Sequence, residues 1–279
     1  MKIYEKLSFD EERALYGERD IIIKSCSFDG PADGESAMKE AGRVTAERCY
    51  FNLRYPFWHC DGVSISYCEM TENCRAALWY SGDIDISGSK LHGIKALREC
   101  SRTRLSDCDV ISPEFGWFSS DITARACSFV SEYCMLRAKN LDFKDISFKG
   151  KYSFQYIENS VFENCNFDTK DAFWHAKNVT VRNSTVKGEY LAWYCESVTF
   201  ENCTIIGTQP LCYCKDLKLI NCRMEGCDLS FEKSTVEAEI IGHIDSVKNP
   251  YGRVIADSIG EVIEATDSRC DIKLREMVL

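Results

Sequence analysis

The chain has 279 residues, with 34 Lys and Arg against 44 Asp and Glu, and a formal net charge of −10 at pH 7. Because Lys and Arg form no long run, phosphate backbones are poor partners, and we expect no nucleic-acid binding. Apolar content of 45% and charged content of 28% argue against disorder.

The first element in chain order is a predicted helix over residues 8–16, SFDEERALY. Ser8 and Glu11 have the spacing of a capping box, and Gly17 is expected to stop the helix. We therefore expect residues 1–19 to cap the N-terminal end of the fold. This segment has no apolar signal region, and no later stretch is long enough to span a membrane. Seventeen cysteines in such a chain predict reduced thiols and a cytoplasmic location.

From residue 20 to residue 243 the sequence repeats. The strings VTVRNSTV (179–186) and VTFENCTI (198–205) share the pattern apolar-x-apolar-x-x-small-x-apolar. The small position recurs every nineteen residues, at Ser89, Cys108, Cys127, Ile146, Cys165, Ser184, Cys203, Cys222 and Ile241. Upstream, Cys26, Cys49 and Cys68 extend the series, with steps of twenty-three, nineteen and twenty-one residues up to Ser89. Such a period predicts about twelve stacked repeats.

Each repeat is predicted to contain short strands. Apolar residues alternate in the strings above, and a second, aromatic-rich strand precedes them in PFWHC (56–60), AFWHA (172–176) and LAWYC (191–195). Nineteen residues hold three short strands and three bends. The sequence therefore predicts an all-β fold, a right-handed parallel β-helix whose coils lie about 4.8 Å apart. A leucine-rich-repeat solenoid is the alternative, although helix formers are scarce in each repeat.

The C-terminal part, residues 244–279, departs from the period. We expect irregular last coils followed by a mobile tail. No composition change marks a boundary, so the sequence predicts a single domain over residues 1–279. Oligomeric state is not predicted.

Two columns of the repeat are interpreted as structural. One column shares a phase at a bend and can form hydrogen bonds from coil to coil: Asn164, Asn183, Asn202 and Asn221. The cysteine column alternates with Ser and Ile, as an inward position of limited size would. A straight column of thiols does not converge on a metal ion, so neither a metal site nor a cofactor is expected.

Several motifs resemble a known family. They are DGES (33–36), YPFWHC (55–60), KDAFWHAKNVTV (170–181), GEYLAWY (188–194), STVEAEI (234–240) and NPYGRVIADSIGEVI (249–263). The chain is similar in these motifs to a largely bacterial family, catalogued only as a domain of unknown function, with a pectin-lyase-like single-stranded β-helix fold. The resemblance implies the fold and implies no activity or catalytic residues.

All five tryptophans share one phase of the repeat: Trp58, Trp79, Trp117, Trp174 and Trp193. Small residues two positions away on either side favour packing in the core. Arg98 and Gln155 occupy the same column and argue against a core position, since an unpaired buried guanidinium is costly. An exposed sugar-stacking stripe is the alternative.

The next column supplies the candidate ligand-binding residues. Alternation along a strand predicts that it faces away from the tryptophans. Its members mix aromatic, imidazole, carboxylate and guanidinium groups: His59, Tyr80, Glu99, Phe118, Arg137, Tyr156, His175, Tyr194 and Tyr213. A tyrosine combines an apolar ring with a polar tip, which suits a sugar. A solvated strand face rich in tyrosine is the alternative.

Two functions remain open from the sequence. The first is a non-enzymatic protein that binds an elongated ligand, a glycan or a protein, along this column. The second is a hydrolase or lyase acting on a poly- or oligosaccharide. A glycosidase needs two carboxyl groups at a set separation, and the column supplies only Glu99 near its middle. A cleft with two carboxylates, or His175 beside a carboxylate, would favour the enzyme, whereas a flat tyrosine ridge would favour binding.

Overall fold

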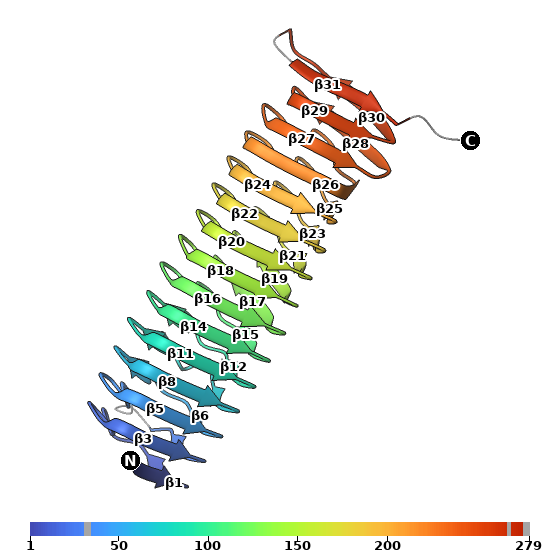
Figure 1. The fold of residues 1–279 in the computed structure, drawn as a ribbon. Helices are drawn as coiled ribbons and strands as arrows, with labels where there is room; N and C mark the ends of the chain where they lie inside the picture. Colours follow the sequence, from blue (N-terminus) through green and yellow to red (C-terminus); the bar gives the residue numbers. More distant parts are fainter. Residues whose placement is uncertain (31–34, 267–268, 276–279) are drawn as a thin grey trace. The chain divides into compact units, whose positions relative to one another are not determined.

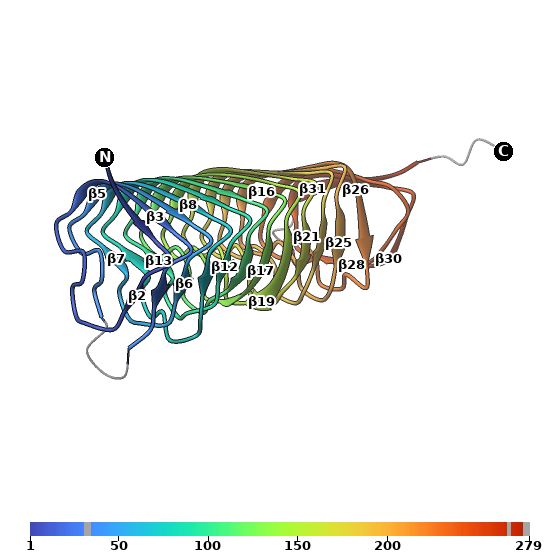
Figure 2. The ribbon, with the colours of Figure 1, turned by 90° about the horizontal axis from the view of Figure 1, so that it is seen from below.

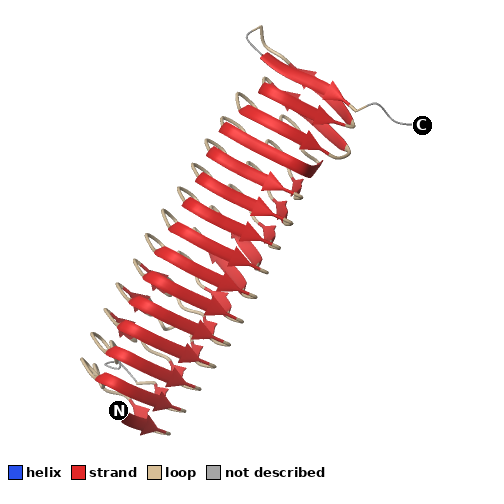
Figure 3. Cartoon of the chain, viewed as in Figure 1, coloured by secondary structure: helices blue, strands red, loops and turns tan. Residues whose placement is uncertain are grey.

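The computed structural model describes residues 1–30, 35–266 and 269–275. The chain divides into two compact units, residues 1–147 and 148–279, and each is described by itself. Both are parallel β-solenoids, and together their described residues make about fourteen turns, slightly more than predicted. Figure 3 shows strands and turns but no helix in the described chain, which excludes the leucine-rich-repeat alternative. Accordingly, no helix long and apolar enough to cross a membrane occurs in these ranges.

The strands of the first unit lie on three sides of the solenoid (Figure 2), although only three described coils have a strand on the third side. The longest side pairs in parallel and in chain order: β1 (Lys2–Glu5), β3 (Arg19–Lys24), β5 (Gly42–Glu47), β8 (Asp61–Ser66), β11 (Gly82–Ser87), β14 (Ser101–Ser106), β16 (Ser120–Arg125) and β18 (Lys139–Lys144). Figure 1 shows these strands stacked one beyond the next. The second side holds β2 (Ser8–Phe9), β4 (Ser27–Phe28), β6 (Tyr50–Phe51), β9 (Glu69–Met70), β12 (Lys90–Leu91), β15 (Asp109–Ile111) and β17 (Ser128–Glu132). The third side holds β7 (Phe57–Trp58), β10 (Leu78–Trp79) and β13 (Leu97–Arg98).

The register of the long strands follows the predicted steps. Arg19 pairs with Gly42, Gly42 with Asp61, and Asp61 with Gly82. These pairs are twenty-three, nineteen and twenty-one residues apart, as the spacing of Cys26, Cys49, Cys68 and Ser89 predicts. Inward Val and Ile side chains therefore lie over one another, and outward polar side chains do the same.

The predicted helix over residues 8–16 is wrong. Ser8 and Phe9 form β2, which pairs in parallel with β4, and the Phe9 ring stacks on Phe28 with centroids 4.8 Å apart. The backbone N–H groups of Arg13 and Leu15 donate to carbonyls of the following coil, at 3.0 and 2.8 Å. A helix would satisfy those donors internally, but stacking satisfies them between coils and half-buries Phe9 against Phe28. Residues 8–16 are therefore part of the first coil rather than a cap.

The second unit repeats the arrangement. Its long strands are β20 (Glu158–Glu163), β22 (Lys177–Arg182), β24 (Glu196–Glu201), β26 (Lys215–Glu225), β27 (Thr235–Ile240), β29 (Tyr251–Ala256) and β31 (Arg269–Leu274). Its shorter strands are β21 (Asn166–Asp168), β23 (Thr185–Lys187), β25 (Thr204–Ile206), β28 (His243–Lys248) and β30 (Ser258–Ile263). β19 (Ser147–Lys151) begins at the last residue of the first unit.

The second unit keeps the nineteen-residue step until its last coils. Val179 pairs with Val198 and Val198 with Leu217. The step then shortens, since Thr235 pairs with Tyr251 and Tyr251 with Arg269. The coils after residue 243 therefore have shorter steps, and they still form strands. The mobile tail predicted for the extreme C-terminus falls on residues 276–279, which lie outside the described residues.

The structural columns lie where the period places them. In the second unit, Cys165, Cys203 and Cys222 are buried, and the Cys203 thiol donates to the carbonyl of Val181, 3.3 Å away. The Asn202 side-chain amide donates to the side-chain carbonyl of Asn183 at 3.2 Å. Both Asn residues adopt left-handed backbone angles, with φ of 52° and 49°. The ladder therefore satisfies side-chain amides at a bend, as predicted.

Candidate binding site

The backbone at the candidate column decides which way its side chains point. In the second unit, Tyr156, His175, Tyr194 and Tyr213 all have left-handed φ values between 56° and 60°. A left-handed residue interrupts the alternation of a strand, so the preceding residue and the left-handed residue both face outward. The buried positions are instead two residues before the column, as in Phe173, and one residue after it, as in Ala176.

The predicted core position of the tryptophans is therefore wrong. All five are half-buried and lie on the same outer side as the candidate column. Three of the indole N–H groups donate to the next coil: Trp117 to the carbonyl of Tyr133 at 2.5 Å, Trp174 to Tyr190 at 2.6 Å and Trp193 to Gln209 at 2.7 Å. Trp79 instead contacts the Glu99 side chain at 3.4 Å, and the Trp58 indole N–H has no hydrogen-bond partner among the described residues. The predicted opposition of the two columns is wrong for the same reason.

The two polar residues of the tryptophan column fit this position. The Gln155 side-chain amide donates to the carbonyl of Asp171 at 3.1 Å, sixteen residues on, as the indoles do. In the first unit the Arg98 guanidinium lies 5.4 Å from the Trp79 ring and 5.3 Å from the Trp117 ring, and its Nε is 3.2 Å from Glu99 Oε1. Neither group is buried without a partner, and their presence in the column agrees with its outward-facing position.

In the second unit the structure brings four candidate residues into one stack. Tyr156 and His175 have ring centroids 4.6 Å apart at an interplanar angle of 8°. The centroid distances are 5.1 Å from His175 to Tyr194 and 5.0 Å from Tyr194 to Tyr213, at angles of 10° and 13°. Beside them, Trp174 and Trp193 stack at 5.4 Å and 4°. We call these six side chains the aromatic strip.

The stack controls which parts of the rings are accessible. Because the ring planes are nearly parallel and one coil apart, each ring covers the faces of its neighbours. Tyr156 and Tyr194 remain 38% and 47% exposed. For Tyr194, whose two faces are covered by His175 and Tyr213, the ring edge remains accessible. The strip therefore presents hydroxyl and imidazole edges about every 5 Å, close to the spacing of parallel strands.

Burial and a neighbouring carboxylate tune two members of the strip. Burial lowers the pKa of His175, so the imidazole is held neutral, and each ring nitrogen can act only as a donor or an acceptor. Burial, with a smaller effect from Glu232, raises the pKa of Tyr213 to about 12, so its hydroxyl stays protonated. Glu232 itself lies 3.0 Å from the Lys248 ammonium. The strip is thus uncharged at neutral pH and ends at an ion pair.

In the first unit the remaining candidate residues form a less regular group. The rings of His59 and Tyr80 are 4.9 Å apart but tilted by 37°. Glu99 pairs with Arg98, which also lies 5.7 Å from the Phe118 ring. Arg137 is exposed. This part of the column mixes charged and aromatic groups and does not form a continuous stack.

Sequence reasoning named the stacked residues but missed the contribution of Trp174 and Trp193 to the same surface. A signal was present: Gln155, Trp174 and Trp193 all carry a side-chain N–H donor, which a core column does not need. When several repeats carry a side-chain N–H donor at the same position, each donor is expected to find a backbone carbonyl acceptor on the neighbouring coil.

Comparison with known proteins identifies the family. Residues 2–275 match the family described as "Protein of unknown function (DUF3737)", so the chain belongs to it. No curated protein matches. Among solved structures, the chain is similar to PfbA, a surface adhesin of Streptococcus pneumoniae, with 9% identity, a TM-score of 0.39, and coverage of 85% of this chain and 76% of that chain.

Two further structures are similar. Tailspike protein 3 of bacteriophage CBA120 has 10% identity and a TM-score of 0.33, with 97% of this chain and 50% of that chain covered. A trypsin-treated form of QnrB1, a plasmid-mediated fluoroquinolone resistance protein, has 12% identity and a TM-score of 0.19, with 85% and 91% covered. The functional argument therefore comes from the geometry of this chain.

Proposed function

We propose that this member of the DUF3737 family is a non-enzymatic binding protein that holds an elongated glycan along the aromatic strip. The observation that carries the proposal is the regular stack of Tyr156, His175, Tyr194 and Tyr213, whose ring centroids lie 4.6–5.1 Å apart. Each exposed hydroxyl is both a donor and an acceptor, which matches the hydroxyl groups of a sugar.

Binding through ring edges differs from the usual stacking of a sugar on an aromatic face. The faces of His175 and Tyr194 are covered by their neighbours in the stack. Affinity would then come from hydrogen bonds to the tips of the rings, and the apolar ring edges would cover the sugar carbons. The tip of Tyr194 is the central contact in this arrangement, because its ring lies between two others and is 47% exposed.

The surroundings of the strip favour a narrow ligand. Immediately after it in each coil stand charged residues, and Lys177 Nζ pairs with Glu196 Oε2 at 3.3 Å. On the other side Trp174 and Trp193 are fixed to the next coil by their indole bonds. A narrow sugar chain that runs along the strip can contact one ring after another. A protein ligand would need an interface with a larger apolar centre than the strip offers.

Binding is better supported than catalysis at this site. The neighbours of the His175 ring are the faces of Tyr156 and Tyr194 rather than a carboxylate. Glu232, the carboxylate beside the end of the stack, is paired with Lys248. A glycosidase needs two carboxyl groups at a set separation, and none of the six side chains of the aromatic strip is a carboxylate.

We also place the protein in the cytoplasm. All seventeen cysteines are free thiols, and only Cys270 is not fully buried. Free thiols in this number suit a reducing compartment.

A glycan-array screen followed by titration calorimetry tests the proposal. We expect the wild-type protein to bind a subset of oligosaccharides, and Tyr194→Phe to weaken the Kd about threefold to tenfold, since it removes one neutral hydrogen bond and keeps the ring. Tyr67→Phe is the matched control, because Tyr67 is 64% exposed and belongs to the first unit. Binding to no glycan, or equal affinity in both variants and wild type, would overturn the proposal.

A further inference from the structure

A hollow of about 480 Å³ lies on the outer face of the long sheet in the first unit. It is centred on β8, whose outward side chains are unusually small: Gly62, Ser64 and Ser66. The flanking strands carry larger outward groups, among them Arg43 on β5 and Asp83 and Asp85 on β11. The hollow is therefore a trench along β8 between two higher rims.

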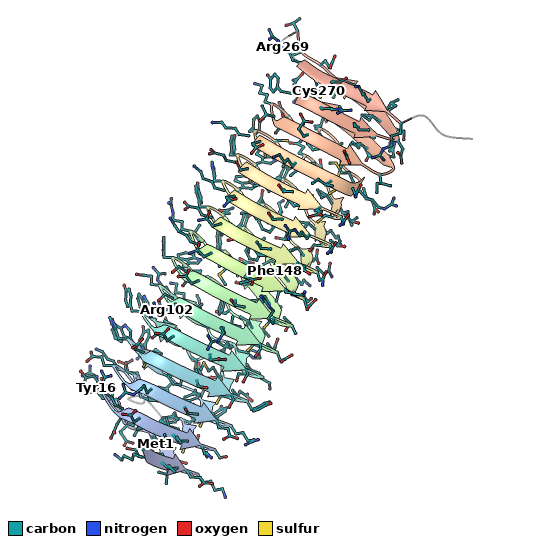
Figure 4. All side chains as sticks on the ribbon, viewed as in Figure 1. Met1, Tyr16, Arg102, Phe148, Arg269 and Cys270 are labelled. Atoms are coloured by element: carbon teal, nitrogen blue, oxygen red, sulfur yellow. The ribbon has the colours of Figure 1, made fainter. Side chains whose placement is uncertain are left out.

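The trench interrupts a ladder of ion pairs. In register, successive long strands place Asp20, Arg43, Gly62, Asp83 and Arg102 in one column. The Arg43 guanidinium donates two hydrogen bonds of 2.6 Å to the Asp20 carboxylate. In the same way Arg102 (labelled in Figure 4) donates two bonds, of 2.6 and 2.9 Å, to Asp83. Gly62 lies between these two Arg–Asp ion pairs in the column and has no side chain.

Backbone geometry does not explain this glycine. Gly62 has φ of +71°, but Arg43, Asp83 and Arg102 occupy the same column at 52°, 52° and 51° with full side chains. Crowding does not explain it either, because a Cβ on Gly62 would come no closer than 3.5 Å to Arg43. The position tolerates a side chain, and its absence opens the space between Arg43 and Asp83, two coils or about 9.6 Å apart.

The lining indicates the chemistry of an occupant. Asp85 is also paired, with Arg104 at 2.9 Å, so charges of both signs are balanced along the rims. A balanced lining favours neither an anion nor a cation. Met1 and Ile22 add apolar surface beside the charged and hydroxyl groups, so the lining suits a ligand with both hydroxyl groups and apolar carbons. A carboxylate offers about four acceptor positions and a guanidinium five donors. Each Asp–Arg ion pair therefore keeps acceptor and donor positions for further hydrogen bonds. Ser64 and Thr45 add hydroxyl groups.

We propose that this trench is a second binding site, which takes a neutral saccharide whose hydroxyl groups bond to the paired Asp and Arg side chains. Asp83 is not suited to act as a glycosidase acid, because its hydrogen bond with Arg102 lowers the pKa of its carboxyl group. The site belongs to the first unit and shares no residue with the aromatic strip. It can therefore be tested independently of the proposed function.

Amide chemical-shift mapping on the ¹⁵N-labelled full chain tests this inference. The probes are cello-, manno- and xylotetraose, with tetragalacturonate as the anionic comparison. We expect saturable shifts at Thr45, Gly62 and Ser64 with at least one neutral probe. Gly62→Asn should weaken that binding at least tenfold and should fold, because Asn adopts left-handed angles readily and fills this column at Asn140. Ser64→Gln is a second variant that fills the trench floor.

The outcomes separate the two sites. Ser197→Asn, in the equivalent column of the second unit, is the matched control and should leave the trench shifts unchanged. Shifts confined to the strip, lost in Tyr194→Phe and kept in Gly62→Asn, would overturn the trench and retain the proposed function. Shifts confined to the trench would support this inference alone. No shift at the trench with any neutral probe, or a response to tetragalacturonate only, would overturn it.

Discussion

At the residue scale, the half-buried column is built around one hydrogen bond. Trp117, Trp174 and Trp193 each donate an indole N–H to a carbonyl sixteen residues later, and Gln155 donates its amide in the same way. The accepting carbonyls belong to residues with left-handed backbones, such as Tyr190 and Gln209, with φ of 54° and 48°. At these four positions a planar group with a donor is therefore favoured by the bond as well as by its apolar surface.

This requirement predicts a selective loss of stability. Trp193→Phe removes the 2.7 Å bond to Gln209 and should lower the free energy of unfolding by about 1 kcal/mol more than Trp79→Phe does. Trp79 is the control, since its indole makes only a 3.4 Å contact with Glu99. Urea unfolding of the two variants measures the difference, and equal losses would contradict the importance of the indole bond.

Asp171 carries a second prediction. It is 7% exposed, and burial raises the pKa of its carboxyl group. The folded protein therefore holds a proton at higher pH than the unfolded chain does, and ionisation at neutral pH destabilises the fold. Asp171→Asn should raise the free energy of unfolding at pH 7, and the gain should shrink as the pH falls toward about 4. A pH series of urea melts checks this, and a gain that does not change with pH would contradict it.

At the scale of the element, the sequence predicted the period but not the path of the chain through each coil. Inward Val and Ile residues and the cysteine column located the long strands correctly. The segment before them was expected to alternate as a strand, yet His175 and Tyr194 are left-handed. No local signal marks this, because neither residue is Gly or Asn. Their backbone N–H groups donate to the next coil at 2.9 and 3.0 Å, and this stacking offsets the cost of the conformation.

The same limit explains the helix that was predicted for residues 8–16. A capping-box spacing at Ser8 and Glu11 is a local signal, whereas the parallel pairing of Phe9 with Phe28 is a contact between coils. For the candidate site, the members of the stack could be named from the period. Which edges of the rings are accessible could not be predicted. It depends on the orientation of the ring planes, which is set by the spacing between coils.

The stack predicts a pH dependence of stability through His175. Burial lowers the pKa of its imidazole, so the unfolded chain takes up a proton below about pH 6.5 before the folded chain does. The contribution of this group is therefore complete above pH ~6.5 and is lost as the pH falls below that value. Between pH 7.5 and 5.5 the wild type should lose more stability than His175→Phe, which keeps a ring and cannot titrate. Thermal melts at each pH measure the two losses, and parallel losses would contradict the assignment.

At the scale of the whole molecule, each coil contacts mainly the coils before and after it. In the second unit β22 pairs with β20 and β24, and β24 pairs with β22 and β26. Stability in such a stack is close to a sum over coils and their neighbours, so the effects of a change remain local. The net charge of −10 adds a general repulsion that ion pairs between coils, such as Lys177–Glu196, partly offset.

Local cooperativity gives a prediction for hydrogen exchange. Phe173 is 1% exposed and packs on Phe154 with centroids 5.1 Å apart. Phe173→Ala should cost about 3–5 kcal/mol. Amide exchange should then accelerate most in residues 150–215 and change little in residues 42–125, as followed by mass spectrometry. An equal acceleration in both ranges would show that the chain unfolds as one unit instead.

The central claim is that the outward ring edges of the aromatic strip are the ligand-contacting surface of this protein. A crystal structure with the best glycan from the array screen tests it most directly. We predict density for the sugar chain running along Tyr156, His175, Tyr194 and Tyr213, with a sugar hydroxyl within hydrogen-bond distance of the Tyr194 hydroxyl. Density for that glycan only at another surface, with the strip solvated, would contradict the claim.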